Sequence, residues 1–229
     1  MSRGGDAARS VLRGVGETLI TVGVIVLLFC VYELTYTGVY TEQQQSRLGA
    51  DLRHDWAEPA ATPQQSLTRV PLGHGMAVIW IPKVGMVGDR ATVVVEGVST
   101  DDLKKGPGHY PRTAMPGGLG NTVISGHRTT YGAPFNRVDE LKPGDAIVLE
   151  TRDAWFTYRV TGSRVVAPTA IEVTYAVPED ARAVPTQHLL TLTTCNPKYS
   201  ARQRLIVRGQ LETTLAKSEG VPPALTGSV

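Results

Sequence analysis

One stretch of the sequence combines a strand pattern with a reactive side chain at its end. Within Thr191–Pro197 and just before it, Leu190 and Leu192 alternate with threonines, which is typical of a strand with one apolar face. Cys195 lies at the end of this strand, on the face opposite the leucines, and Pro197 ends the strand because proline has no N–H to donate. A lone cysteine is more often a small apolar core residue, so its interpretation depends on its companions.

Two further side chains complete a set that could transfer an acyl group. His127 follows a predicted strand, and Arg204 begins the strand after Cys195. A cation near a thiol lowers the thiol pKa, a cysteine nucleophile needs a base, and the oxyanion that forms needs a donor. A lone histidine at a strand end is usually a surface residue, so the prediction of a catalytic site rests on all three residues together.

The elements that must position these residues are short strands from residue 76 onward. The 24 glycines and 15 prolines fit strands joined by tight turns. A short helix is predicted over Ser99–Lys105, with Ser99 as its N-cap, and one or two helical turns over Pro134–Leu141. This pattern predicts an all-β domain built as a small closed or nearly closed barrel. The predicted strands are Met76–Ile81, Ala91–Glu96, Asn121–Gly126, Asp145–Thr151, Trp155–Ala167, Leu189–Thr194 and Arg204–Glu212.

The N-terminal part of the chain predicts a membrane anchor. Thr18–Tyr40 is 23 residues long with Glu33 as its one charge, and roughly 20 apolar residues cross a bilayer. Three arginines precede it, which by the positive-inside rule leaves residues 1–16 in the cytoplasm. A cleaved signal peptide is the alternative. Because no small-x-small cleavage site follows and the segment is long, we expect residues 17–40 to form an uncleaved single-pass anchor.

The remaining boundaries follow from composition. Residues 41–69 are rich in Gln, Ala, Pro and charge and are predicted to be an extracellular linker. Residues 70–212 form the predicted catalytic barrel, and residues 213–229 a disordered tail. The net charge of +2 gives no sign of a nucleic-acid partner. Cys30 lies in the apolar segment and Cys195 in the barrel, so no disulfide between them is expected.

Several motifs together resemble the sortase family. Thr191–Cys195 matches the Thr-Leu-x-Thr-Cys nucleophile signature at every fixed position. Asn121–His127 is similar to the histidine strand of the family, Arg204 to its essential arginine, and Ile81–Gly85 to its first-strand motif. The resemblance covers roughly Leu72–Leu211, and it implies an eight-stranded sortase-type closed β-barrel with short helices, preceded by one N-terminal transmembrane helix.

Two segments narrow the resemblance to one class. Gly108–Pro111 and Arg204–Val207 are most similar to class E sortases of high-GC Gram-positive bacteria. This implies a membrane-anchored extracellular cysteine transpeptidase that needs no cofactor and cuts a C-terminal sorting signal of surface proteins between Thr and Gly. The implied class E signal is Leu-Ala-x-Thr-Gly. The implied acceptor is an amine of lipid II or peptidoglycan, or a lysine of a pilin.

The resemblance also implies roles for individual residues. Cys195 is the expected nucleophile, and His127 first protonates the leaving amine and then deprotonates the incoming one. Arg204 is expected to bind substrate carbonyls and the oxyanion, with Arg202 as the fallback if the strand register slips by two. The residues expected to contact substrate are Tyr110, Thr193 and Thr194.

No metal site is predicted, and two other functions stay open. Some class A sortases use calcium, but Glu172, Glu179 and Asp180 find no carboxylate partner before His127, so we expect a solvated acidic loop. A cysteine L,D-transpeptidase would carry Ser-His-Gly shortly before its cysteine, which this sequence lacks. A catalytically silent barrel that only binds sorting signals is the other alternative, because the presence of Cys195 does not establish its geometry.

Overall fold

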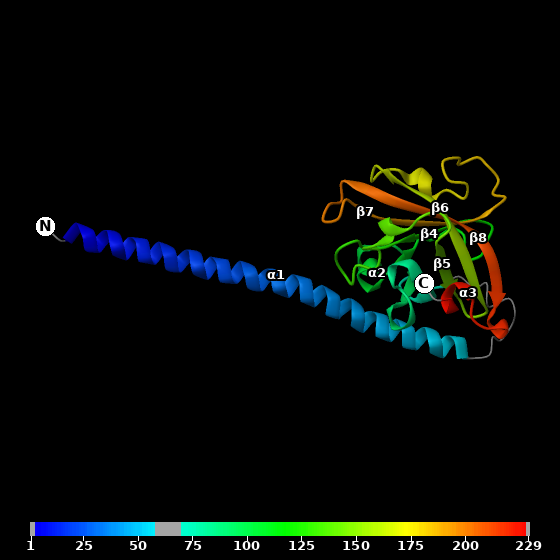
Figure 1. Cartoon of the computed structure of the whole chain (residues 1–229), viewed down its shortest axis with the longest axis horizontal. Coiled ribbons are helices and arrows are strands. Elements are labelled where there is room, and N and C mark those ends of the chain that lie inside the picture. The colour runs from blue at the N-terminus through cyan, green and yellow to red at the C-terminus, as the bar shows by residue number, and fades with distance from the viewer. Residues whose placement is uncertain (1–2, 58–69, 228–229) are drawn as a thin grey trace.

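The computed structural model describes residues 3–57 and 70–227, which form one long helix and a barrel (Figure 1). Helix α1 (Arg3–Ala57) includes a segment from Val11 onward that is long and apolar enough to cross a membrane. The N-terminal half of α1 projects away from the barrel, whereas its C-terminal half lies along it.

The predicted eight-stranded closed barrel is confirmed. Its strands follow the order β1-β2-β3-β4-β7-β8-β6-β5, and they are antiparallel except for the parallel pairs β2–β3 and β4–β7. The strands are β1 (Gly75–Trp80), β2 (Thr92–Glu96), β3 (Gly108–His109), β4 (Gly120–Ser125), β5 (Ala146–Glu150), β6 (Ala154–Val166), β7 (His188–Asn196) and β8 (Gln203–Ala216).

Short helices lie between some of the strands, as expected, and two more follow the last strand. The predicted Ser99 cap is present on α2, where the hydroxyl of Ser99 accepts from the Asp102 N–H. The region Pro134–Leu141 contains only one short turn of 3-10 helix. The helices are α2 (Thr100–Lys105), α3 (Pro223–Thr226) and the 3-10 turns η2 (Pro82–Val84), η3 (Gly88–Arg90), η4 (Val138–Glu140), η5 (Ile171–Thr174) and η6 (Lys217–Glu219).

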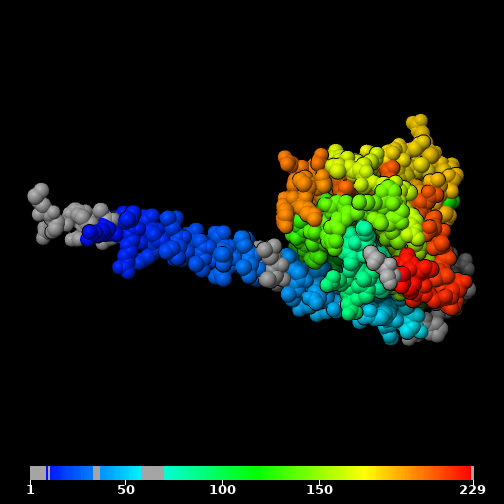
Figure 2. Space-filling model, in the orientation of Figure 1, coloured from blue at the N-terminus to red at the C-terminus, as the bar shows by residue number. Residues whose placement is uncertain are grey.

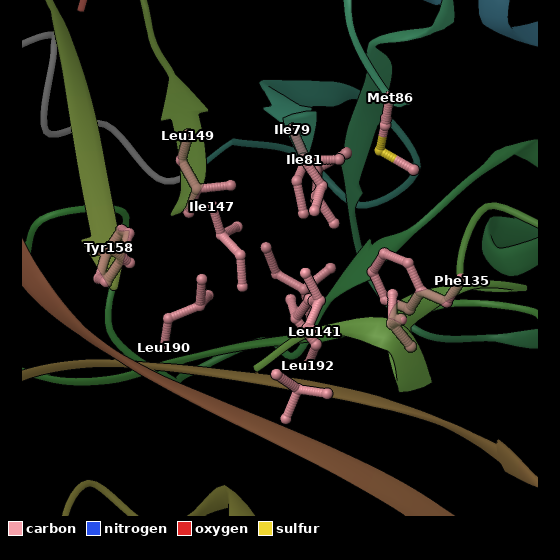
Figure 3. Packing of buried hydrophobic residues seen from close by; sticks show 14 of the residues in the cluster. Ile79, Ile81, Met86, Phe135, Leu141, Ile147, Leu149, Tyr158, Leu190 and Leu192 are labelled. Carbon is pink, nitrogen blue, oxygen red and sulfur yellow. The ribbon is translucent and has the colours of Figure 1, made fainter. Parts of the chain in front are cut away.

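Alternate side chains of the strands fill the barrel. Leu190 and Leu192 are fully buried, which confirms the apolar face predicted for β7. Figure 3 shows side chains from different strands, such as Ile79 and Leu192, pointing toward one another across the core. Phe135 packs on the backbone at Gly126, where an added Cβ would lie 2.6 Å from the ring. A glycine is therefore needed just before His127.

The barrel is closed unevenly at the seam between β2 and β3. These strands pair only over the last two residues of β2, so the first half of β2 lacks a strand partner on this side. The side chain of Gln45 in α1 takes that place: its amide donates to Val93 O (3.0 Å) and Lys105 O (2.8 Å), and its oxygen accepts from Val93 N–H (2.7 Å). Gly106 leaves room for this contact, because a Cβ there would lie 2.2 Å from the Gln45 amide nitrogen.

The prediction of a linker is wrong for residues 41–57, which continue α1 and pack on the barrel. Thr41 and Leu52 are each 5% exposed, and the Thr41 hydroxyl donates to Lys104 O (2.9 Å). Much of this contact is made by Thr and Gln side chains, so the period of apolar residues did not reveal it. The rest of the predicted linker, residues 58–69, lies outside the described residues.

The predicted disordered tail is also wrong up to residue 227. Strand β8 extends to Ala216, which pairs with Ala154 of β6. Beyond it, the Lys217 ammonium lies over the rings of Trp155 (3.9 Å) and Trp56 (5.5 Å), so the tail contacts both the barrel and α1. The pairing partner is far away in sequence, and composition alone therefore misses it.

Candidate active site

The ends of β4, β7 and β8 bring the three predicted catalytic residues together. In the antiparallel β7–β8 ladder Cys195 lies directly opposite Arg204, so both side chains project from the same face. In the parallel β4–β7 ladder Ser125 pairs with Thr193, and the Gly126 N–H continues the ladder by donating to Thr193 O (3.1 Å). His127 thus comes level with Cys195 on the side away from Arg204.

The thiol of Cys195 is partly exposed and is not in a disulfide. Its strand alternation places it opposite to the buried leucines of β7, as predicted from the sequence. The cysteine therefore combines a rigid backbone with access to solvent, which a nucleophile that attacks an external peptide requires.

The imidazole of His127 is partly buried and packs against a neighbouring aromatic ring in a tilted arrangement. The His127 and Tyr131 ring centroids are 5.0 Å apart at an interplanar angle of 35°. Burial lowers the pKa of His127 below its ordinary value of 6.5, because desolvation disfavours the charged imidazolium. The neutral imidazole is consequently favoured at neutral pH.

The guanidinium of Arg204 is held against the chain that connects β7 to β8. Its Nη1 donates to Ala201 O (2.9 Å) and Gln203 O (3.0 Å), which uses one of the nitrogens of a group with five N–H donors. Arg202 precedes β8 and is not the residue opposite Cys195. The fallback of a register slipped by two is therefore wrong.

Arg128 supports the site and was not recognised from the sequence. Its guanidinium is almost fully buried, donates to Cys195 O (3.2 Å) and Asn136 O (3.3 Å), and pairs with Asp139 (3.0 Å). It thereby ties the end of β7 to the loop after His127. The sequence signal was the arginine directly after His127, but nothing local indicated that it would be buried.

The two predicted substrate-binding threonines are both almost fully buried. Thr194 is 2% exposed, and its hydroxyl donates to Gly126 O (2.7 Å), so it links β7 to the residue before His127. This differs from the prediction that Thr194 contacts substrate, because alternation along β7 turns its side chain away from the Cys195 face. Thr193 lies on the same face of β7 as Cys195 and is 6% exposed.

Tyr110, the third predicted substrate-binding residue, lies directly after β3 and is partly exposed. Its N–H donates to Val123 O (2.9 Å) of β4. The preceding residue, His109, is buried with Nδ1 2.6 Å from a Glu96 carboxylate oxygen, and its Nε2 is 3.0 Å from Ala114 O. The backbone that carries Tyr110 is thus fixed on both sides.

Within residues 3–57 and 70–227, no group of three or more His, Cys, Asp or Glu side chains is placed to hold a metal ion. Glu179, in the acidic loop, accepts from Arg164 and Arg208 instead. Two cavities, of about 330 and 350 Å³, open beside the loop Tyr131–Pro134 and not over Cys195. The strand register therefore defines the candidate site better than an enclosed cavity does.

The strand register places the thiol of Cys195 between the imidazole of His127 and the guanidinium of Arg204. The sequence is matched to a protein family over the same strands. Residues 79–212, more than half of the chain, match the family model described as a sortase domain. The chain belongs to the sortase family. Sortases are cysteine transpeptidases, so the protein is an enzyme of this type.

Its relatives include class E sortases. The chain is 36% identical over 221 residues to Sortase SrtE1 of Streptomyces coelicolor; the match covers 93% of this chain but only 60% of that relative. It is 41% identical to the solved sortase E from Streptomyces avermitilis (TM-score 0.61, covering 68% of this chain and 99% of that one). It is 36% identical to Sortase E1 from Streptomyces coelicolor with a tripeptide in the active site (TM-score 0.61, covering 69% and 99%). These matches confirm the resemblance to class E.

Proposed function

We propose that this sortase is a membrane-anchored transpeptidase that cleaves a sorting signal between Thr and Gly and transfers the protein to an amine of the cell wall. The observation that supports it best is the register that sets Cys195 between His127 and Arg204. Substrates are surface proteins that bear the signal. The acceptor is an amine of lipid II or peptidoglycan.

The three side chains divide the reaction into two balanced steps. The Cys195 thiol passes its proton to His127 as sulfur attacks the Thr carbonyl, and His127 then protonates the departing Gly amine, leaving a thioester. In the second step His127 takes a proton from the incoming amine, which displaces sulfur, and the proton returns to the thiolate. Arg204 stabilises the oxyanion in both steps.

Neutral His127 suits this sequence of proton transfers. Burial favours the uncharged imidazole before substrate binds, so the ring is ready to accept the thiol proton. A permanently charged imidazolium could protonate a leaving amine but could not deprotonate the incoming one.

We assign the Ala preference of the Leu-Ala-x-Thr-Gly signal to Tyr110. A Pro in the second position lacks an N–H, whereas Ala has a free N–H and little bulk. A large side chain with a hydrogen-bonding tip suits the space that Pro would fill, and Tyr110 stands on a backbone fixed by β4 and by the buried Glu96–His109 pair. Similarity to class E sortases supports this assignment.

Cleavage of two peptides that differ only in Ala or Pro at that position tests the assignment. Tyr110→Ala removes one hydrogen bond to substrate, worth about 1–3 kcal/mol, so kcat/KM for the Ala peptide should fall about ten- to a hundredfold. The Pro peptide should be cleaved equally well or better. An equal fall for both peptides would mean that Tyr110 supports its loop and does not read the signal.

The orientation in the membrane is part of the proposal. The apolar segment of α1 and the arginines before it support a cytoplasmic N-terminus and an extracellular barrel. A reporter fused before Met1 should be active only inside the cell, and the mature protein should begin at or next to Met1. A secreted form that starts near residue 41 would show a cleaved signal peptide instead.

A further inference from the structure

The connection between β7 and β8 faces the membrane-spanning half of α1. This hairpin loop, Pro197–Arg202, is the orange tip of the barrel in Figures 1 and 2, and it lies at the end nearest the N-terminal half of the helix. It begins two residues after Cys195 and ends two residues before Arg204, so the active site opens at this same end.

Helix α1 fixes this orientation because it is docked on the barrel immediately after its apolar segment. Thr41 and Gln45 bond to the backbone of α2 and β2, and the helix runs unbroken from there back to Arg3. A flexible tether would let the barrel tumble, whereas a docked helix holds one end of the barrel toward the bilayer from which the helix emerges.

The hairpin loop carries side chains that suit a lipid surface. Tyr199 at its tip is 88% exposed, although large aromatic residues are usually buried, and its φ of 65° is a left-handed conformation that is uncommon for side chains of this size. The turn is held by Ser200 N–H donating to Pro197 O (3.0 Å). Lys198 and Arg202 flank the tyrosine.

We propose that the hairpin loop rests on the anionic lipid surface around α1 and holds the Cys195 site against the membrane. Tyrosine is favoured at the membrane–water interface, and lysine and arginine are attracted to anionic headgroups. The inference rests on the membrane anchoring in the proposed function. As a consequence of this contact, Cys195 reacts with sorting signals and acceptor amines at the point where they emerge from the membrane.

Spin-label accessibility in the full-length protein tests the position of the loop. In a Cys30→Ser, Cys195→Ser background reconstituted in vesicles that contain phosphatidylglycerol, single labels are placed through Ala201→Cys, Val184→Cys and Leu27→Cys, and Ala201 is an exposed residue of the hairpin loop whose labelling keeps Tyr199 in place. Val184 is 80% exposed and lies before β7, a nine-residue strand about 26 Å long that ends at the hairpin loop. Leu27 lies in the apolar segment of α1.

Collisions with oxygen, which concentrates in lipid, and with a water-soluble nickel chelate report the depth of each label. The ratio of the two collision rates should be severalfold higher at position 201 than at 184, and highest at 27. A label at 27 in lipid with labels at 201 and 184 equally aqueous would overturn the proposal while leaving the anchor intact. An aqueous label at 27 would instead reject the anchor itself, and the proposal with it.

A charge variant tests whether the surface is anionic lipid. Arg202→Gln should reduce the lipid contact of the label at 201 in vesicles with phosphatidylglycerol, because one cation near an anionic surface is worth about fivefold in partitioning. The same change should have no effect in purely zwitterionic vesicles. Arg182→Gln, an exposed arginine before β7, is the matched control and should change nothing. Equal results for both arginine variants would overturn the electrostatic part of the proposal.

Discussion

Two parts of the barrel wall are closed in different ways. The strands β4, β7 and β8, which carry the candidate active site, are joined by long ladders in which every residue of Gly120–Ser125 and of Leu189–Asn196 has a partner. The seam between β2 and β3 has two paired positions and depends on the Gln45 side chain of α1. The site is therefore positioned by backbone that is stable without its reactive side chains, whereas the seam is held by a side chain.

This difference predicts opposite consequences of mutation. Changes at Cys195 and Arg204 should remove activity and leave the fold almost unchanged, because neither side chain belongs to the core of the barrel. Changes at the seam should remove stability and leave the activity of the folded fraction almost unchanged. Each variant below is thus to be measured for turnover and for unfolding.

The largest expected effect is that of Cys195→Ala. Loss of the nucleophile removes the covalent route, so peptide cleavage and the thioester seen by mass spectrometry should both disappear. The thiol is small and partly exposed, so the free energy of unfolding should fall by about 1 kcal/mol or less. Residual turnover in this variant would contradict the assignment of the nucleophile.

Arg204→Lys should have the next largest effect on turnover. Lysine keeps the positive charge but lacks the planar fork that can hold two oxygens, so kcat should fall about a hundredfold or more. Arg202→Lys is the matched control: it lies two residues away, outside β8, and should leave the rate near that of the wild type. Near-normal rates for Arg204→Lys would mean that this arginine only holds the hairpin carbonyls it contacts.

The meeting of Cys195, His127 and Arg204 at one end of the barrel could be predicted from the sequence because each residue lies in a local pattern. Alternation of Leu190 and Leu192 located the strand and the face of Cys195, and Gly126 marked the strand end before His127. Placing them together needed only a barrel in which these strands are neighbours, which the resemblance to sortases supplied.

The parts that escaped prediction depend on partners distant in sequence. The Gln45 side chain donates a hydrogen bond to Val93 O, and the Arg128 side chain donates one to Cys195 O. In each case a polar side chain bonds to a backbone atom far away in the sequence. Such polar residues add nothing to the apolar periodicity of a helix and resemble surface positions. The C-terminal part of α1 was therefore predicted to be a linker from its composition. Burial of Thr194 was missed for a related reason, since its hydroxyl bonds to Gly126 O.

Gln45→Ala tests the prediction for the seam between β2 and β3. It leaves the N–H and C=O of Val93 without these partners on a buried strand, which should lower the free energy of unfolding by about 2–4 kcal/mol. Gln43→Ala, an exposed glutamine on the same helix, is the control and should change stability little. The kcat of the folded Gln45→Ala protein at low temperature should stay near that of the wild type. A fall in kcat without a fall in stability would contradict the division between site and seam.

The smallest expected effect concerns the free energy of unfolding, which the partly buried imidazole of His127 lowers at acidic pH. Burial lowers the pKa of His127 in the folded protein below 6.5, its value in the unfolded chain, so between the two values the unfolded chain binds more protons. Stability must therefore rise with pH across that window. The cost of keeping the imidazole uncharged is fully present below the folded-state pKa and vanishes well above pH 6.5.

In His127→Gln, which cannot be protonated, this dependence of stability on pH should be absent. The difference in unfolding free energy between the wild type and His127→Gln should therefore be constant above pH 7 and move in favour of the variant as the pH falls. Denaturant titrations on both sides of pH 6.5 measure it, with His74→Gln, at an exposed histidine, as the control. A difference that does not change with pH, or an NMR titration of His127 centred at or above 6.5, would show that the ring carries no such cost.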